Sequence, residues 1–323
     1  MRASRWIVLA IALVVASLAG VTIGTLRLSP AEVLHGLLGD GSLVQVAVVR
    51  TLRLPRVVLA ALVGAGLGSA GAALQGATRN GLAEPYLLGV SGGAAVGAVL
   101  AVALHAPPAV VPLAGFAGAL GAVALTLLVA RAAGGQGDAR VVLMAGVVVG
   151  AFANAAIMVA LANAQDNVVR GALWWMMGSA SDASWPQVRM LALYVAIGIA
   201  VLLAFARAID VLALGEDTAA GLGVRVARVS LTVYVAAALL AAGTVAAAGL
   251  VGFIGLLVPH LVRMAGARTH RTIISAAALA GATLVVLADL VARVARPPAE
   301  LPLGAVTAII GVPFFLARLR RLA

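Results

Sequence analysis

The segment from Arg53 to Gly93 reads RLPRVVLAALVGAGLGSAGAALQGATRNGLAEPYLLGVSGG and is the most informative part of the chain. From Val57 to Thr78 it is free of charge and rich in glycine, and it has the length of about 20 apolar residues that a helix needs to cross a bilayer. A polar connection that contains Pro85 follows directly. This combination predicts a segment of a membrane transporter.

Composition gives the same class. Hydrophobic residues make up 63% of the 323 positions, charged residues 10%, and the mean hydropathy is +1.14. So little polar surface cannot cover a soluble globule. We therefore predict an all-α, polytopic membrane protein with about ten transmembrane helices, at residues 6–26, 55–76, 86–104, 109–131, 141–163, 188–207, 228–248, 251–264, 272–295 and 302–319.

The first apolar segment has two interpretations. Arg2 and Arg5 followed by WIVLAIALVVASLAG resemble a signal peptide with a small-residue cleavage site. The apolar run continues to Leu26, beyond the length of an ordinary signal core, so we favour a retained first span. The chain has no cysteine, which excludes disulfides and thiolate chemistry.

Basic residues indicate the orientation. All 22 are arginine, and 14 of them lie in the cytoplasm if both chain ends do, so the positive-inside rule favours this arrangement. The predicted inner group is Arg2, Arg5, Arg79, Arg131, Arg140, Arg207, Arg225, Arg228, Arg263, Arg268, Arg271, Arg318, Arg320 and Arg321. The predicted outer group is Arg27, Arg50, Arg53, Arg56, Arg170, Arg189, Arg293 and Arg296. The net charge of +11 does not indicate nucleic acid, because these arginines are scattered over helix ends.

Glycine pairs four residues apart recur within the spans. They include Gly64 and Gly68, Gly93 and Gly97, and Gly146 and Gly150. Small residues at this spacing let helix backbones approach closely in lipid, so we expect a compact bundle. The spacing is common in polytopic proteins and does not name a function.

Ionisable residues are absent from the centres of the predicted spans. Asp289 and Arg293, four residues apart, can pair with each other near an outer helix end. An ion-coupled carrier, the main competing class, holds acidic or histidine residues within the membrane. The chain also lacks lysine and so cannot form an ATP-binding P-loop. We expect no catalytic or cofactor site in this chain, and a separate subunit to supply any ATP hydrolysis. A purely structural membrane protein is a further alternative.

Several motifs, spread in order over the whole chain, resemble one family. They are RLPR at Arg53–Arg56, LQGATRNGLAEPYLLGVSGGA at Leu74–Ala94, LALGEDTAAGLGV at Leu212–Val224, AGLVGFIGLLVPHLVR at Ala248–Arg263, LADLVAR at Leu287–Arg293 and ELPLGAVTAIIGVPFF at Glu300–Phe315. The chain resembles the permease subunits of type II bacterial ABC importers for iron chelates, haem and vitamin B12. The resemblance implies one permease domain over residues 1–323 in the bacterial inner membrane.

That resemblance also implies partners. It implies two copies of the chain around a central pathway, two cytoplasmic ATPases that hold ATP and Mg²⁺, and one periplasmic binding protein. The loop at about 208–227 resembles the coupling helices that sit in a cleft of each ATPase, and Glu216 and Asp217 suit a helix N-terminus. The alternative is an ordinary solvated loop. The implied coupling residues are Leu214, Gly215, Glu216, Asp217, Thr218, Ala219, Ala220, Gly221, Leu222 and Gly223.

At the outer side the resemblance implies that Arg53, Arg56 and Arg293 receive acidic residues of the binding protein. Guanidinium groups suit this role because they pair with carboxylates through two parallel hydrogen bonds. Lipid headgroup contacts and internal pairing are the alternatives, and Asp289 is the obvious internal partner of Arg293.

The pathway is also implied by the resemblance. The predicted helix at 141–163 matches the span that lines the channel, and the implied cytoplasmic gate is Asn80, Leu82, Asp138 and Ala139. Gly81 stands where the family usually has proline, which loosens the local backbone and weakens the assignment of a gate there.

Cargo is the least determined property. Ser91-Gly-Gly-Ala94 is closer to haem permeases than to vitamin B12 permeases, so haem is the first expectation, with siderophores and cobalamin as alternatives. Trp174 and Trp175 could stack on a porphyrin, but packing at the membrane interface is the favoured interpretation. We expect no metal site at the histidines, which are His35, His105, His260 and His270.

Overall fold

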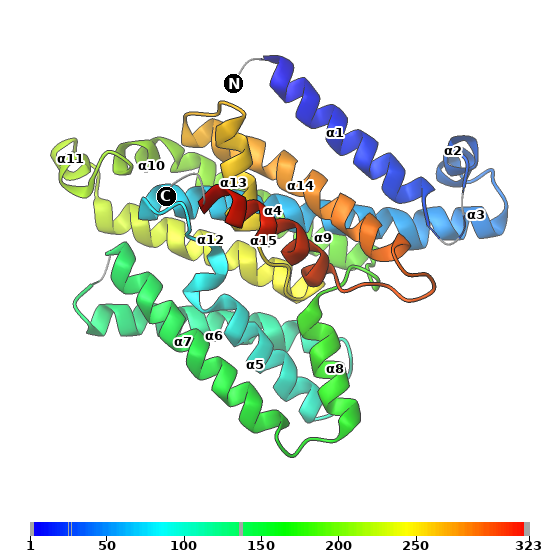
Figure 1. Cartoon of the computed structure of the whole chain (residues 1–323), viewed down its shortest axis with the longest axis horizontal. Helices are drawn as coiled ribbons and strands as arrows, with labels where there is room; N and C mark the ends of the chain where they lie inside the picture. Colours follow the sequence, from blue (N-terminus) through cyan, green and yellow to red (C-terminus); the bar gives the residue numbers. More distant parts are fainter. Residues whose placement is uncertain (1–2, 25, 27, 136–137, 320–323) are drawn as a thin grey trace.

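The structure is a computed structural model that describes residues 3–24, 26, 28–135 and 138–319. Every regular element in these ranges is helical (Figure 1). The elements are α1 (Ala3–Thr22), α2 (Pro30–Leu38), α3 (Leu43–Ala47), η1 (Val48–Arg53), α4 (Leu54–Thr78), η2 (Pro85–Leu88), α5 (Val90–Ala103), α6 (Val110–Ala132), α7 (Ala139–Leu161), α8 (Asp166–Met177), α9 (Trp185–Ala204), α10 (Ala206–Leu212), α11 (Glu216–Gly221), α12 (Val226–Ala248), α13 (Ile254–Met264), α14 (His270–Val294) and α15 (Leu303–Leu319).

The predicted all-α membrane fold is confirmed. Seven helical segments in the described chain are long and apolar enough to cross a membrane, and three shorter apolar helices coincide with the remaining predicted spans. The short ones are Val90–Ala103, Ile254–Met264 and Leu303–Phe314. Because their length falls below a full span, the count of ten crossings stays a prediction.

The helix predicted at 86–104 begins later than expected. Pro85–Leu88 forms a 3₁₀ turn, and Gly89 follows it with φ of 84°. This left-handed backbone suits glycine and separates the turn from α5, which starts at Val90. The short helices α2, α3 and α8 were not predicted, because they lack the apolar length by which spans are recognised.

Helix α4 forms the centre of the molecule. Every residue from Leu67 to Thr78 is buried, and α14, α12, α13 and α9 pack around it. A methyl group placed on Gly64 or Gly68 would collide with the backbone of Gly281 or Ala277 on α14. The close approach expected from the glycine spacing is therefore present between these two helices.

A second group consists of α5, α6 and α7, which lie below the α4 group in Figure 1. Gly93 and Gly97 on α5 face the backbone of Gly118 and Ala114 on α6, where a methyl group would again collide. Gly146 is similarly close to the carbonyl of Leu87, whereas a methyl group on Gly150 would meet no other atom within 4 Å. The expected close packing thus holds for most of the glycine pairs.

Candidate functional site

The molecule has two distinct ends (Figure 1). α1 begins, α15 ends and α11 lies at one end, which we call the inner end, following the orientation predicted from the arginines. α2, α3 and the connection between α14 and α15 lie at the opposite, outer end. The predicted docking, coupling and gate residues divide between these two ends.

A buried ionic cluster occupies the outer end. The Arg56 side chain donates to Asp289 through Nε at 3.0 Å and Nη2 at 2.9 Å, and to Glu300 through Nη1 and Nη2 at 2.8 Å each. Asp289 also pairs with Arg293, with 3.2 Å between Nε and Oδ2. Their side chains are less than a tenth exposed, except that of Glu300, which is 39% exposed. Paired charges with this geometry offset the cost of burying them.

Backbone carbonyls accept hydrogen bonds from the other two guanidinium groups. Arg53 donates to the carbonyls of Val21 near the end of α1, at 2.8 Å, and of Leu26 in the connection after it. Arg293 donates to the carbonyl of Gly20 on α1, at 3.0 Å. These bonds fasten α1 to α4 and α14.

All three predicted docking arginines lie together at the outer end, but they are buried and have partners within the chain. Of the alternatives, the geometry supports internal pairing. This pairing includes Arg56 and Glu300 in addition to the expected contact between Asp289 and Arg293. Glu300 is the one partly exposed carboxylate in the cluster. The hydrogen bond from Arg56 lowers the pKa of Glu300, so its charge is retained in mildly acidic solution.

The predicted coupling residues form a short helix at the inner end. α11 is bounded by Gly215 and Gly223, whose φ angles of 121° and 82° are accessible mainly to glycine. Ala219 is fully buried. Leu214, which precedes the helix in the chain, is 67% exposed, and Leu222, which follows it, is 64% exposed. Figure 1 shows α11 projecting from the bundle.

Two contacts hold this segment to the bundle. Arg79, just after α4, pairs with Glu216 at 3.0 Å, and both side chains are about two-fifths exposed. Asp210 on α10 accepts from the backbone N–H of His270 at 2.8 Å and lies 2.7 Å from its Nδ1. α11 is thus connected directly to the inner end of α4, and through α10 to the inner end of α14.

The predicted gate residues lie on two segments. Asn80 Oδ1 accepts from the Leu82 N–H at 2.9 Å, and the Leu82 side chain is half exposed. Asp138 caps α7 by accepting from the Arg140 N–H at 2.8 Å, and Ala139 behind it is buried. Each hydrogen bond stays within its own segment, so the grouping of these residues as a gate stays a prediction.

Helix α7 has one packed face and one bare face. Val142, Gly146 and Val149 are buried against η2 and α5, whereas Phe152 and Met158 are 71% and 73% exposed. α15 has a similar bare face, with Ile309 71% exposed. Such faces fit a neighbouring copy, a pathway or lipid.

Two hydrogen bonds join the connection after α4 to the connection before α13 in a polar junction, and they were not predicted from the sequence. Glu84 accepts from the Phe253 N–H at 2.9 Å, and the Val251 N–H donates to the Tyr86 hydroxyl at 3.2 Å. Burial raises the pKa of Glu84, although the bond from Phe253 opposes the shift. In this junction Phe253 has a φ of 68°. The Glu-Pro sequence gave no signal of a partner so distant in the chain.

Helix α8 ends with residues Leu173–Met177, and Gly178 follows with a φ of 75°. Trp175 packs against Gly115 on α6, while Trp174 is half exposed. Both line an outer cavity of about 1000 Å³ that Glu300 also borders.

The histidines are separate from one another. His260 lies edge-on to Phe314, with 6.0 Å between ring centroids, and His35 Nδ1 is 3.1 Å from Asp40. Within the described ranges, no group of three potential metal-binding side chains is found.

Apolar spans, a helical projection at the inner end and bare helix faces define a subunit of a membrane transport assembly. Comparison with known families makes this specific. The chain belongs to the FecCD transport family, whose model matches residues 10–321. It is a multi-pass permease of the type II ABC importer family, located in the cytoplasmic membrane.

Similar proteins are named for the transport of different substrates. The cobalamin import permease of Halobacterium salinarum is 42% identical, covering 84% of this chain and 73% of that protein. The hemin transport permease of Yersinia pestis is 38% identical, covering 82% and 80%. The Fe(3+)-citrate import permease YfmE of Bacillus subtilis is 35% identical, covering 97% and 94%.

A solved chain from a metal-chelate type ABC transporter in an inward-facing conformation also matches. It superposes with a TM-score of 0.88 at 27% identity, and the match covers 99% of this chain and all of that one.

Proposed function

We propose that this chain is the permease of an ATP-driven, binding-protein-dependent importer that moves haem across the cytoplasmic membrane by alternating access. The observation that carries the proposal is α11, which projects from the inner end between the exposed side chains of Leu214 and Leu222. An apolar knob on a short helix suits a cleft in an ATPase, and its rigid-body movement can transmit closure of that partner.

Two copies of the chain, two ATPases that bind ATP and Mg²⁺, and one binding protein make up the proposed assembly. The bare face of α7 lines the pathway between the two copies, and Asn80, Leu82, Asp138 and Ala139 close it at the inner end. The chain performs no covalent chemistry. Its contribution is to exchange the side on which the pathway is open.

At the outer end we propose that acidic residues of the binding protein dock over Arg53, Arg56 and Arg293. Because Arg56 already has two carboxylate partners, an incoming carboxylate replaces the exposed one, Glu300. Glu300→Gln then strengthens docking, whereas Arg56→Ala abolishes it. Equal affinity of both variants and the unchanged protein would contradict docking at this cluster.

Haem is the proposed cargo because the sequence Ser91-Gly-Gly-Ala94, in the first turn of α5, is similar to the corresponding sequence of haem permeases. Relatives named for Fe(3+)-citrate and cobalamin have similar identities and support an iron-siderophore or cobalamin importer as the alternative. The test is reconstitution in liposomes with the ATPase and binding protein, measuring ATP hydrolysis with haem-loaded, siderophore-loaded and cobalamin-loaded binding protein. Stimulation by haem alone supports the proposal, and stimulation by another cargo alone replaces haem with that cargo. Cargo movement without the ATPase overturns the importer itself.

A further inference from the structure

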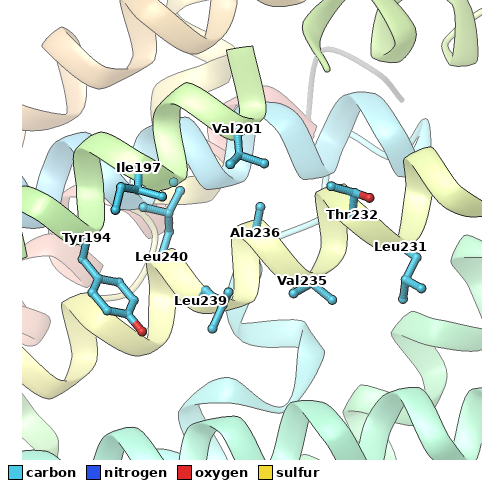
Figure 2. Close-up of a pocket in the computed structure, with 10 residues that line it drawn as sticks. Tyr194, Ile197, Val201, Leu231, Thr232, Val235, Ala236, Leu239 and Leu240 are labelled. Atoms are coloured by element: carbon cyan, nitrogen blue, oxygen red, sulfur yellow. The ribbon is translucent and has the colours of Figure 1, made fainter. Parts of the chain in front are cut away.

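An apolar groove lies between α9 and α12 (Figure 2). It has a volume of about 530 Å³ and is bordered by Tyr194 and Val201 on α9 and by Leu231, Val235 and Leu239 on α12. The hydroxyls of Tyr194 and Thr232 are the polar side-chain groups of its lining, and Thr232 Oγ1 donates to the carbonyl of Arg228 at 2.8 Å. The groove is thus almost wholly apolar and has the size of a ligand pocket.

The groove has an open side. Ile197 is 57% exposed and Leu231 38% exposed, while Leu240 packs over Gly198 at the base. A methyl group on Gly198 would lie 2.6 Å from Leu240 Cγ, so the small residue creates the depth. Because both helices are among the candidate membrane spans, this opening lies at the depth of the lipid chains.

A positive charge marks the inner end of the same helix face. Arg228 precedes Thr232 by four residues and Val235 by seven, which places it on the groove side of α12. Arg225 and Arg207 are also exposed at this end. In the described part of the chain, no carboxylate forms an ion pair with these three arginines. Of the acidic side chains nearest along the chain, Glu216 pairs with Arg79 and Asp210 with His270, while the exposed Asp217 forms no ion pair with a described residue.

We propose that an anionic phospholipid of the inner leaflet occupies this groove, with an acyl chain against α9 and α12 and its phosphate on Arg228. The groove supplies the apolar surface, and the arginine supplies a charge that complements the negative inner leaflet. A second copy of the chain fits less well. A two-fold interface on this face would bring the same arginines toward one another.

The test uses the full-length protein purified in a mild detergent, with native mass spectrometry to count retained lipids. Phosphatidylglycerol binds about five-fold more tightly than phosphatidylcholine, the effect of one arginine at an anionic surface. Arg228→Gln removes this preference. Arg131→Gln, a change of an exposed arginine at the inner end of α6, retains it. Equal binding of the two lipids by the unchanged protein, or equal effects of the two variants, overturns the proposal.

A second pair of variants tests the groove itself. Val235→Trp fills it and lowers the retention of both lipids, and Leu239→Trp serves if the first variant does not fold. A tryptophan that alters the dimer fraction and leaves the lipid count unchanged assigns the face to a second copy. Phosphatidylglycerol that inorganic phosphate displaces, and that both tryptophan variants leave bound, assigns the site to an anion on Arg228 outside the groove. Either outcome overturns lipid binding without affecting the importer assignment.

Discussion

At the outer end, the side chains of Arg56, Asp289 and Arg293 are less than a tenth exposed, whereas those of Arg79 and Glu216 at the inner end are about two-fifths exposed. The outer charges hold α1, α4, α14 and the connection before α15 in one arrangement. The inner pair holds only a short helix to the bundle. A buried ionic cluster is costly to rearrange, while an exposed pair exchanges its partner readily. The difference separates an outer cluster that fixes the packing of several elements from an inner pair that can exchange its partner without disturbing the bundle.

Removal of the shared outer carboxylate is expected to have the largest effect on stability. Asp289→Asn leaves Arg56 and Arg293 without their common partner and lowers the free energy of unfolding by about 3–5 kcal/mol. Thermal unfolding in detergent measures it. The inner-end control Asp217→Asn changes stability by no more than about 0.5 kcal/mol, because Asp217 is exposed. Similar losses in the two variants would mean that the ends do not differ.

The inner end is tested through its apolar residues. A variant with Leu214→Ser and Leu222→Ser loses contacts worth about 1.5–3 kcal/mol each if the ATPase buries them. We expect association with the ATPase to weaken more than tenfold, while the melting temperature of the isolated permease is unchanged. Co-purification titrations and thermal unfolding measure the two effects. Val8→Ser, on an exposed position of α1, is the matched control. Unaltered ATPase binding would remove α11 from the coupling role.

Acid titration separates two carboxylates by the sign of their effect. The pKa of Glu300 is lowered, so its stabilising contribution is present above pH 4.5 and is lost as pH falls through its folded-state pKa. The pKa of Glu84 is raised, so stability falls as pH rises from 4.5 through its folded-state pKa. The melting temperature of the unchanged protein relative to Glu300→Gln is therefore expected to rise as pH rises toward 4.5. Its melting temperature relative to Glu84→Gln is expected to fall as pH rises above 4.5. Parallel pH profiles would contradict the assignment.

The smallest effect is expected at the exposed pair. Glu216→Gln removes its charge-assisted bond to Arg79 and changes the free energy of unfolding by no more than about 1 kcal/mol. High salt reproduces this change in the unaltered protein, because exposed charges are screened. A loss as large as that of Asp289→Asn would show that the inner pair also fixes the fold.

Much of the fold follows from the sequence, because a helix that crosses the bilayer must be long and apolar and hydropathy shows such segments directly. The span predicted at 55–76 is observed at Leu54–Thr78, and the one predicted at 141–163 at Ala139–Leu161. The short helices α2 and α3 each begin with a serine capping box, a local signal that hydropathy does not register.

The sites were less predictable because their partners are distant in the chain. Asp289 and Arg293 were expected to pair from their spacing on one helix. Glu300 lies 244 residues from Arg56, and no local pattern indicates that they meet. The junction of Glu84 with Phe253 likewise depends on a fold that brings two connections together. The proposed docking, coupling and gate roles come from family resemblance and await the measurements above.

The central position of α4 has a consequence for biosynthesis. This helix is made early, yet its main neighbours, α12 and α14, begin at Val226 and His270. Until those segments leave the ribosome, the glycine-lined surface of α4 has only lipid or early helices against it. Arrest of translation before residue 270 should therefore yield an inserted intermediate in which the surface of α4 around Gly64 and Gly68 is accessible to lipid, and completion of the chain should cover it.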